Sequence, residues 1–289
     1  MAIVIFDNNA TLVPLFNYQI KKTNIFMQIT FPNINISYSL HNHSIFSDGA
    51  SSLEEMCQNA KAQGIKVFGM SDHWVIPPTQ DIDAKSWAMN PDDLELYIDK
   101  LLKLKLQLQD ENFSLKIGLE VDFFFENISN VLEYLKQFPL DYLIGSVHFA
   151  DNFPIDHDIR DWANLTEEDK IQICDVYYTK LASAAACKEF AFIGHLDLPK
   201  KFNLIDNKRY FSRAIEVLDV VEKHGNAIEL NTSGFFKQCN EQYPSFDILQ
   251  EAYLRNIPIV VSADAHDAKH VNRNFLIAKD LLQKAKYKV

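Results

Sequence analysis

The chain has 289 residues, enough for one large α/β barrel or for two smaller domains. Hydrophobic residues make up 47% of it and charged residues 23%, as in ordinary globular proteins, and no run of about 18 apolar residues suggests a membrane span. A net charge of −11 argues against a broad basic surface for nucleic acid, so bound cations would have to supply positive charge to an anionic ligand.

We interpret the first 36 residues as an N-terminal extension of unknown role. The stretch VIFDNNATLV contains Asp7 and Thr11, a DxxxT pattern that is similar to the core of haloacid-dehalogenase-type phosphatases. Asn9 replaces the second acid of that pattern, and the residues up to 36 leave no room for the rest of the fold. We therefore expect a packing or exposed segment, or a contact between subunits, rather than a catalytic one.

The N-terminal sequence and the spacing of the cysteines indicate a cytoplasmic protein. Asp7 interrupts the first apolar patch and no basic region precedes it, so a secretory signal is not indicated. No CxxC pair occurs, so neither a zinc knuckle nor a disulfide framework is expected. We expect reduced and mostly buried thiols at Cys57, Cys174, Cys187 and Cys239.

From residue 37 onward, short apolar β-rich runs alternate with amphipathic stretches, which is the pattern of βα units around a parallel sheet. No low-complexity tract or Gly/Ser linker divides residues 37–289, so we expect one domain there. Helices are predicted at 52–64, 91–109 and 211–225, and a long polar loop at 150–166. The predicted strands are 36–42, 66–72, 115–121, 142–148, 191–197, 226–232 and 257–263.

Potential metal ligands gather at the ends of these strands. In SYSLHNHSIFSDG, residues 37–49, His41 and His43 are two residues apart and so project to the same face of a strand. The carboxyl ends of barrel strands meet on one face, which makes neighbours of side chains that are distant in sequence. The candidate ligands are His41, His43, Asp48, His73, Glu120, His148, His195, Asp264 and His266, including six of the nine histidines.

This mixture of imidazoles and carboxylates favours zinc, iron or manganese over calcium, which prefers oxygen ligands. One ion would not use so many donors, so we expect two or three divalent ions with a bridging carboxylate such as Glu120. Clusters of this kind stabilise the attacking and leaving oxygens of a phosphoryl group. His157, His224 and His270 lie in a loop or near helix ends and are expected not to be ligands.

The ordered set of motifs resembles the PHP (polymerase and histidinol phosphatase) superfamily, specifically its histidinol-phosphatase branch. The resemblance covers residues 37–289 and implies a distorted, TIM-barrel-like (β/α)7 barrel, in agreement with the seven predicted strands. Many other members have a histidine where this chain has Gly49, one residue after Asp48, and this favours the histidinol-phosphatase branch. The motifs are HNHSIFSDG, MSDHW, GLEVDFF, GSVHF, IGHLDLPKKF, ELNTSG and SADAH.

The resemblance also implies a trinuclear metal centre and a reaction. The reaction is hydrolysis of L-histidinol phosphate to L-histidinol and phosphate in histidine biosynthesis, by a hydroxide that bridges the ions. Glu120 would bridge ions, and Asp264 or His266 would orient the nucleophile or assist proton transfer. One ion would be held by His41, His43, Glu120 and Asp264, a second by Glu120, His148 and His195, and a third by Asp48, His73 and His266.

A phosphate monoester also needs cationic partners from the protein. Arg160 in the polar loop could bind it through two hydrogen bonds, and Lys200 or Lys201 could offer a point charge. Trp74 and Phe123, next to expected ligands, could form a wall for the imidazole end of the substrate. The alternatives are solvated surface cations and ordinary aromatic packing.

Two other functions stay open from the sequence. A PHP-type phosphoesterase could act on a nucleotide or another small phosphate monoester, because substrate choice depends on variable loops. A metal-binding regulatory or scaffold protein could have kept the cluster without turnover. The acidic charge and the absence of an appended polymerase domain argue against a polymerase-linked exonuclease, and the oligomeric state is not predicted.

Overall fold

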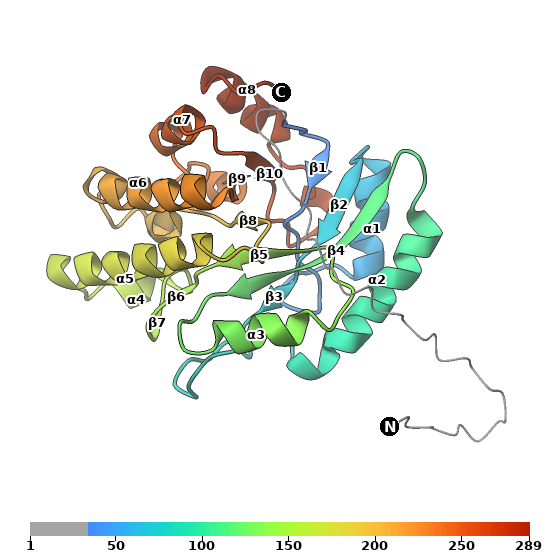
Figure 1. The fold of residues 1–289 in the computed structure, drawn as a ribbon, viewed down its shortest axis with the longest axis horizontal. Coiled ribbons are helices and arrows are strands. Elements are labelled where there is room, and N and C mark those ends of the chain that lie inside the picture. Colours follow the sequence, from blue (N-terminus) through green and yellow to red (C-terminus); the bar gives the residue numbers. More distant parts are fainter. Residues whose placement is uncertain (1–33) are drawn as a thin grey trace.

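Seven parallel strands form a nearly closed ring in the part of the chain that the structure describes, residues 34–289 of a computed structural model (Figure 1). An isolated parallel bridge between Asn42 and Ala265 connects the segments that follow the first and last strands. The predicted distorted (β/α)7 barrel is therefore confirmed. In ring order the strands are β1 (Tyr38–Ser39), β2 (Val67–Met70), β4 (Ser114–Asp122), β5 (Tyr142–Ser146), β8 (Phe192–Ile193), β9 (Ala227–Asn231) and β10 (Ile259–Ser262).

Each of the seven ring strands overlaps one of the seven predicted runs, and all except β4 are shorter than predicted. The clearest case is β1, which ends at Ser39, so that His41 and His43 follow the strand rather than lie on it. Their rings still lie side by side, with centroids 5.0 Å apart, because the bridge at Asn42 keeps this segment extended. Additional short strands are β3 (His73–Trp74), which pairs with β4, and the antiparallel pair β6 (Phe149–Ala150) and β7 (Phe153–Pro154).

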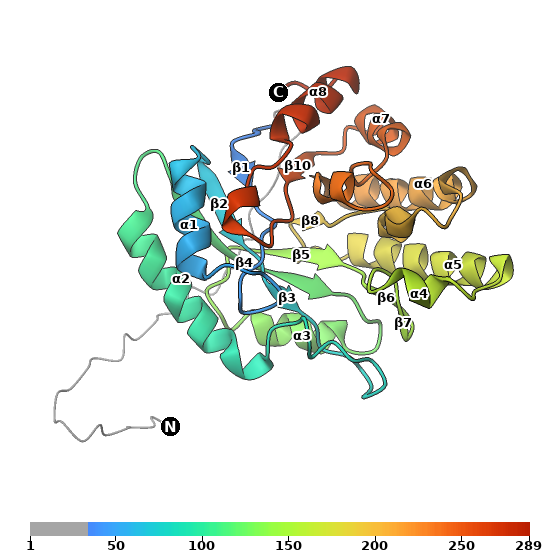
Figure 2. The ribbon, with the colours of Figure 1, turned by 180° about the vertical axis from the view of Figure 1, so that it is seen from behind.

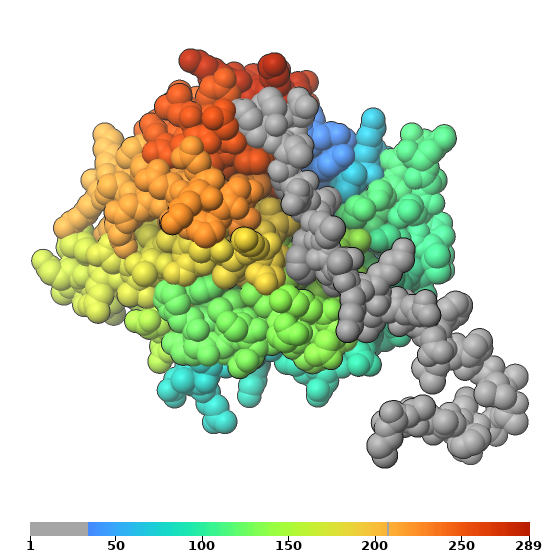
Figure 3. Space-filling view, in the orientation of Figure 1, coloured from blue at the N-terminus to red at the C-terminus, as the bar shows by residue number. Residues whose placement is uncertain are grey.

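The helices lie outside the ring, as Figure 1 and the reverse view in Figure 2 both show. On the face seen in Figure 3, segments that are consecutive in the sequence lie beside one another from α5 through α6 to α7. The α-helices are α1 (Leu53–Ala62), α2 (Leu94–Leu108), α3 (Ile128–Leu135), α4 (Ile159–Trp162), α5 (Glu167–Ala185), α6 (Asn207–His224), α7 (Phe246–Leu254) and α8 (Phe275–Lys284), and the 3-10 helices are η1 (Pro91–Asp93), η2 (Leu198–Phe202), η3 (Ser233–Phe236) and η4 (Ala268–His270).

Local sequence signals account for most helix ends. Ser52 and Glu55 form a reciprocal capping box at the start of α1, as the predicted 52–64 helix requires. Gly225 ends α6 with a positive φ of 71°, but that helix begins at 207 rather than 211 because Asp206 caps it. The predicted 91–109 helix starts with the 3-10 turn η1, and the expected loop at 150–166 contains β7 and α4.

Tyr142 of β5 fills the inside of the ring together with Leu40, Ile144 and other apolar residues. It is fully buried, and its hydroxyl donates a hydrogen bond to the carbonyl of Leu40. A Cβ atom added to Gly118 on the neighbouring strand would lie 2.4 Å from Cζ of the Tyr142 ring. Glycine is therefore required here for the close approach of the ring to β4.

We expect Gly118→Ala to lower the free energy of unfolding by about 1–3 kcal/mol, because the tyrosine ring cannot move away without losing its packing and its hydrogen bond. Urea denaturation of the purified chain measures this change. Lys103→Ala, at an exposed position of α2, is the matched control and should change stability by less than about 0.5 kcal/mol. Equal midpoints for the two variants would contradict the close packing of Tyr142.

Three expectations concern the chain as a whole. Among the described residues, no helix is both long enough and apolar enough to cross a membrane. All four cysteines are free, with Cys57 and Cys174 buried and Cys187 and Cys239 partly buried. The Asp7 and Thr11 pattern lies outside the described residues, as do residues 1–33 of the predicted extension, so its role stays a prediction.

Candidate metal centre

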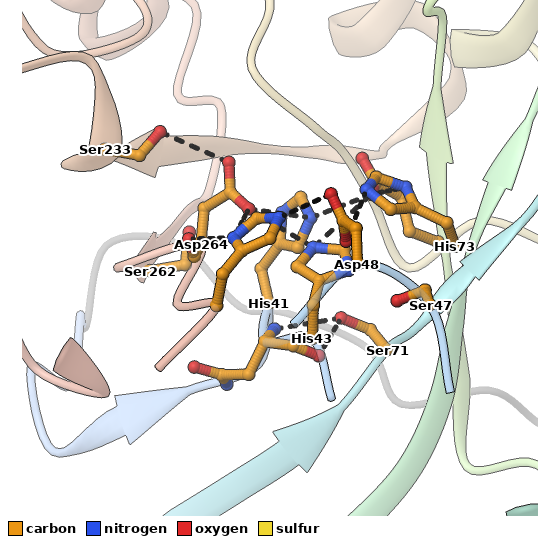
Figure 4. Close-up of polar contacts among 12 residues, drawn as sticks. His41, His43, Ser47, Asp48, Ser71, His73, Ser233, Ser262 and Asp264 are labelled. Atoms are coloured by element: carbon orange, nitrogen blue, oxygen red, sulfur yellow. Dashed lines mark hydrogen bonds and ion pairs between the residues drawn. The ribbon is translucent and has the colours of Figure 1, made fainter. Parts of the chain in front are cut away.

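The segment that follows β1 is shaped by a buried carboxylate, Asp72. Its oxygens accept hydrogen bonds from the backbone N–H groups of Ser44, at 2.8 Å, and Ser47, at 3.1 Å, and from both serine hydroxyls. These bonds fold residues 44–47 into a tight turn. As a result, Asp48 turns back toward His43 and His73, as Figure 4 shows.

A first group of donors joins the segments after β1 and β10 to β4. Nε2 of His41 lies 3.1 Å from Oε2 of Glu120, and Nε2 of His43 lies 3.2 Å from Oδ1 of Asp264. The cross distances are 3.6 Å from His43 to Glu120 and 3.7 Å from His41 to Asp264. Two imidazoles and two carboxylates therefore converge on one small volume.

A second group uses the other oxygen of Glu120. Nε2 of His195, which follows β8, lies 2.9 Å from Oε1 of Glu120, and Nε2 of His148, which follows β5, lies 3.6 Å from the same atom. One carboxylate thus faces the first group with Oε2 and the second with Oε1. This is the arrangement that a bridging ligand between two ions requires.

The third group forms around Asp48. Nε2 of His266 lies 3.1 Å from Oδ2 of Asp48, and Nε2 of His73 lies 3.6 Å from Oδ1. Nδ1 of His73 also lies 2.8 Å from Oε2 of Glu120, which places this group directly beside the first. The structure therefore brings all nine residues of the predicted ligand set together.

Several donor atoms of this cluster are buried and have no hydrogen-bond partner. They include Nε2 of His41, both ring nitrogens of His43 and Oε2 of Glu120. A buried polar atom without a partner costs about 1–3 kcal/mol, and four of them in one place would be unfavourable unless another group satisfied them. Nitrogen and oxygen lone pairs directed at a common point fit a divalent transition-metal ion.

The central carboxylates are held in the ionised form. Burial by itself raises the pKa of Glu120, but the facing His41 and His73 outweigh it and lower that pKa well below its usual range. The same balance keeps the pKa of Asp264 low. Burial, together with the neighbouring histidines, lowers the pKa of His43 to about 3, so this imidazole is neutral. Burial lowers the pKa values of the other imidazoles, but the facing carboxylates outweigh it and raise the pKa values of His41, His73, His148 and His266, so metal binding to these imidazoles would release protons.

Glu229 on β9 supports the cluster from behind, and it was not among the predicted site residues. Its carboxylate accepts hydrogen bonds from Nδ1 of His41 at 2.7 Å, from the backbone N–H of His195 at 2.8 Å and from Nδ2 of Asn231 at 3.0 Å. The hydroxyl of Ser262 also donates to it. The sequence signal that could have identified Glu229 is a single acid within the apolar run NAIELNT. The structure shows that this acid is fully buried.

Asp122 on β4 is a second residue that the sequence analysis missed. Its Oδ1 accepts a hydrogen bond of 2.9 Å from the backbone N–H of His148 and lies 3.8 Å from Nδ1 of the same imidazole. Asp122 follows Glu120 by two residues, so both project to the same side of β4. It therefore helps to orient His148, as outer-shell carboxylates do for metal-binding histidines.

A cavity of about 950 Å³ opens beside the cluster and is lined by seven of the nine predicted ligands. Its wall near His73 includes the Trp87 indole, which lies edge-on to that imidazole with centroids 4.8 Å apart. Lys201 is the only one of the five expected substrate-binding residues found on the cavity wall. Its ammonium lies 3.0 Å from Oδ2 of Asp156, which also lines the cavity.

The expectations for Arg160, Lys200 and Trp74 need correction, because none of them lines this cavity. The Arg160 side chain is 84% exposed and its guanidinium pairs with Asp158 at the start of the short helix α4. The ammonium of Lys200 is buried and lies 2.9 Å from Asp197 and 2.8 Å from Glu241, so it balances two carboxylates inside the protein.

The two aromatic residues that were expected to wall the substrate are packing residues. Trp74 is buried and stacks on Tyr134 of α3, with ring planes 13° apart. Phe123 is likewise buried and meets Phe125 edge-on. Neither residue lines the cavity. Trp74 lies one residue after His73, and Phe123 lies three residues after Glu120. Residues separated by an odd number of positions in an extended segment face opposite sides.

Comparison with known proteins agrees with this geometry. Residues 39–233 match the PHP domain family. The chain is 33% identical over 228 residues to a probable histidinol-phosphatase of Deinococcus radiodurans, with 76% of this chain and 82% of the relative covered. It is 26% identical over 265 residues to a probable histidinol-phosphatase of Schizosaccharomyces pombe, with 85% and 86% covered. The chain belongs to the PHP domain family, in its histidinol-phosphatase branch.

A solved structure shares the fold. The histidinol phosphate phosphatase of Lactococcus lactis, in complex with zinc, L-histidinol and phosphate, superimposes with a TM-score of 0.74. The match covers 87% of this chain and 94% of that one, at 21% identity. This chain therefore has the same fold as that enzyme.

Proposed function

We propose that this chain is a metal-dependent histidinol-phosphatase that hydrolyses L-histidinol phosphate to L-histidinol and phosphate, a step of histidine biosynthesis. The observation that carries the proposal is the convergence of three donor groups around Glu120, beside a cavity large enough for a small substrate. Relatives named histidinol-phosphatase align with most of the chain and support the choice of substrate. The four free thiols support a cytoplasmic location.

The three donor groups suit two or three divalent ions. Zinc is the ion in the Lactococcus lactis complex, and manganese and iron accept the same donor set. Bound here, such ions would supply positive charge for the phosphate oxygens and favour ionisation of a water nucleophile. We assign the first ion to His41, His43, Glu120 and Asp264, the second to Glu120, His148 and His195, and the third to Asp48, His73 and His266.

Of the two residues expected to orient the nucleophile or assist proton transfer, Asp264 and His266, we assign the first role to Asp264. Oδ2 of Asp264 accepts hydrogen bonds from Nδ2 of Asn231, at 3.1 Å, and from the Ser233 hydroxyl, at 3.2 Å (Figure 4). These bonds fix the carboxylate while its side chain remains 15% exposed, so it can orient a water molecule. The His266 side chain is 40% exposed, but its Nδ1 lies 3.0 Å from the backbone carbonyl of Asp264 and its Nε2 faces Asp48, so we assign it to the third ion rather than to proton transfer. Glu120 is fully buried and holds the imidazoles in place.

The rest of the cavity suits a substrate that carries positive charge away from its phosphate. L-histidinol phosphate has a protonated amine as well as a phosphate group, and carboxylates stabilise such an amine. This charge distribution favours it over nucleotides and sugar phosphates, which lack the amine. The carboxylates that line the cavity beyond the donor groups are Asp81, Asp83, Asp156, Asp161 and Asp267.

Steady-state kinetics with a panel of phosphate monoesters tests the proposed function. The purified chain, loaded with manganese or zinc, is assayed with L-histidinol phosphate, nucleoside monophosphates and sugar phosphates. We expect kcat/KM for L-histidinol phosphate to exceed the others by at least about tenfold, or ~1.4 kcal/mol of transition-state discrimination. A preferred nucleotide would favour the general phosphoesterase instead, and no turnover of any ester would favour a regulatory metal protein.

A further inference from the structure

Arg273 differs from Lys201 and His157 on the cavity wall in having no carboxylate partner. Lys237 on the same wall also has none among the described residues, but it is exposed to solvent whereas Arg273 is partly buried. The Lys201 ammonium pairs with Asp156, and the exposed His157 pairs with Asp161 at 2.9 Å. Arg273 has no ion pair with any carboxylate among the described residues, and its Nε is buried without a hydrogen-bond partner. A guanidinium cannot lose its proton, so this partly buried positive charge lacks a partner of its own.

The Arg273 side chain is also held in place. Its Cζ lies 3.6 Å from the centroid of the Phe236 ring, which is within the range of a cation–π contact. Its backbone carbonyl accepts a 2.7 Å hydrogen bond from the Thr232 hydroxyl, and its N–H donates to the carbonyl of His270. Both the backbone and the guanidinium are therefore positioned before any ligand arrives, which lowers the entropic cost of binding one.

The position of Arg273 relates it to the donor groups. It lines the same cavity as Ser233, Asp264 and His266. Burial lowers the pKa of Arg273, and only the charge of Asp264 opposes that effect. Asp264 is in turn occupied by His43, Asn231 and Ser233, so the arginine gains little compensation from it. An anion in the cavity would compensate the charge fully.

We infer that Arg273, positioned on the Phe236 ring, binds the phosphate group of the substrate and of the product through paired N–H···O hydrogen bonds. The identity of the substrate rests on the proposed function, whereas the binding of a phosphate group by Arg273 does not depend on it. A planar guanidinium matches two phosphate oxygens at once, which a lysine cannot do. Arg273 is therefore a determinant of specificity for phosphate esters and replaces Arg160, whose guanidinium lies elsewhere.

Inhibition by the two reaction products separates this role from others. In the metal-loaded full chain, Arg273→Gln should raise KM for L-histidinol phosphate and the inhibition constant of inorganic phosphate by at least about tenfold. The inhibition constant of L-histidinol, which has no phosphate, should stay within about twofold. Arg273→Lys should fall between wild type and Arg273→Gln. Arg209→Gln, at an exposed position of α6, is the matched control and should leave all three constants unchanged.

Two further measurements make the result decisive. Bound metal, counted by mass spectrometry, should be equal in wild type and Arg273→Gln, because Arg273 binds the substrate and not the ions. Calorimetry measures the affinity of wild type and of Arg273→Gln for inorganic phosphate without turnover. This measurement is informative even if L-histidinol phosphate is not the substrate. Three results for Arg273→Gln would each overturn the inference. They are an unchanged inhibition constant of phosphate, an inhibition constant of L-histidinol that rises as much as that of phosphate, and a loss of bound metal.

Discussion

Glu120→Gln is expected to lower kcat by about two to four orders of magnitude and to reduce the number of bound metal ions. Glu120 lies within 4 Å of five imidazoles, and its two oxygens face different donor groups. A metal ion contributes several kcal/mol of charge stabilisation in the transition state, and each ~1.4 kcal/mol corresponds to a factor of ten in rate. Glutamine keeps the volume of the side chain but removes the charge that the ions require.

Metal content after dialysis and steady-state kinetics measure these two effects, and far-UV circular dichroism reports whether the fold is kept. Glu95→Gln, at an exposed position of α2, makes the same chemical change away from the centre and should behave as wild type. If Glu120→Gln retained full metal content and wild-type kcat, Glu120 could not be the carboxylate that the donor groups share.

Glu229→Gln is expected to weaken metal binding by about 10–100-fold, although Glu229 belongs to none of the three donor groups. Its carboxylate accepts a hydrogen bond from Nδ1 of His41, and this bond directs Nε2 of the same ring toward Glu120 and Asp264. Glutamine has one oxygen, and its amide group would face one of the N–H donors that now bind the carboxylate.

Competition with a chromophoric chelator gives the metal affinity of the variant directly, without an activity assay. Glu222→Gln, exposed on α6, is the matched control for loss of one negative charge. Wild-type affinity in Glu229→Gln would mean that the orientation of His41 is determined by packing alone. A drop in kcat at saturating metal, with affinity unchanged, would likewise assign Glu229 a different role.

Local signals predicted the elements well where neighbouring residues determine the structure. The capping box of Ser52 and Glu55 and the positive φ of Gly225 are properties of a few adjacent residues, and the predicted helices begin at Ser52 and end at Gly225 accordingly. Strand lengths were predicted less well, since a ladder ends where the partner strand diverges. For this reason β1 stops at Ser39, although the apolar alternation that begins at Ile36 continues to Leu40.

Most of the substrate-binding predictions were wrong, because the folded chain decides which groups these side chains face. Arg160 and Lys200 are cations near expected ligands in sequence, but each pairs with a carboxylate that only the folded chain identifies as its partner. Trp74 follows His73 directly and still points away from the site. Arg273 lies in a segment with no motif, and it meets Phe236 only because the segments after β9 and β10 lie side by side.

The sequence by itself determined the barrel class and the residues that supply nitrogen and oxygen donors, because strand periodicity and the convergence of strand ends follow from local geometry. Only the tertiary structure decided that Glu229 orients His41, that Asp122 orients His148 and that Arg273 faces the cavity without a carboxylate partner. These three features depend on distances of a few ångströms between segments far apart in the chain, and such distances are determined by side-chain packing across the whole barrel.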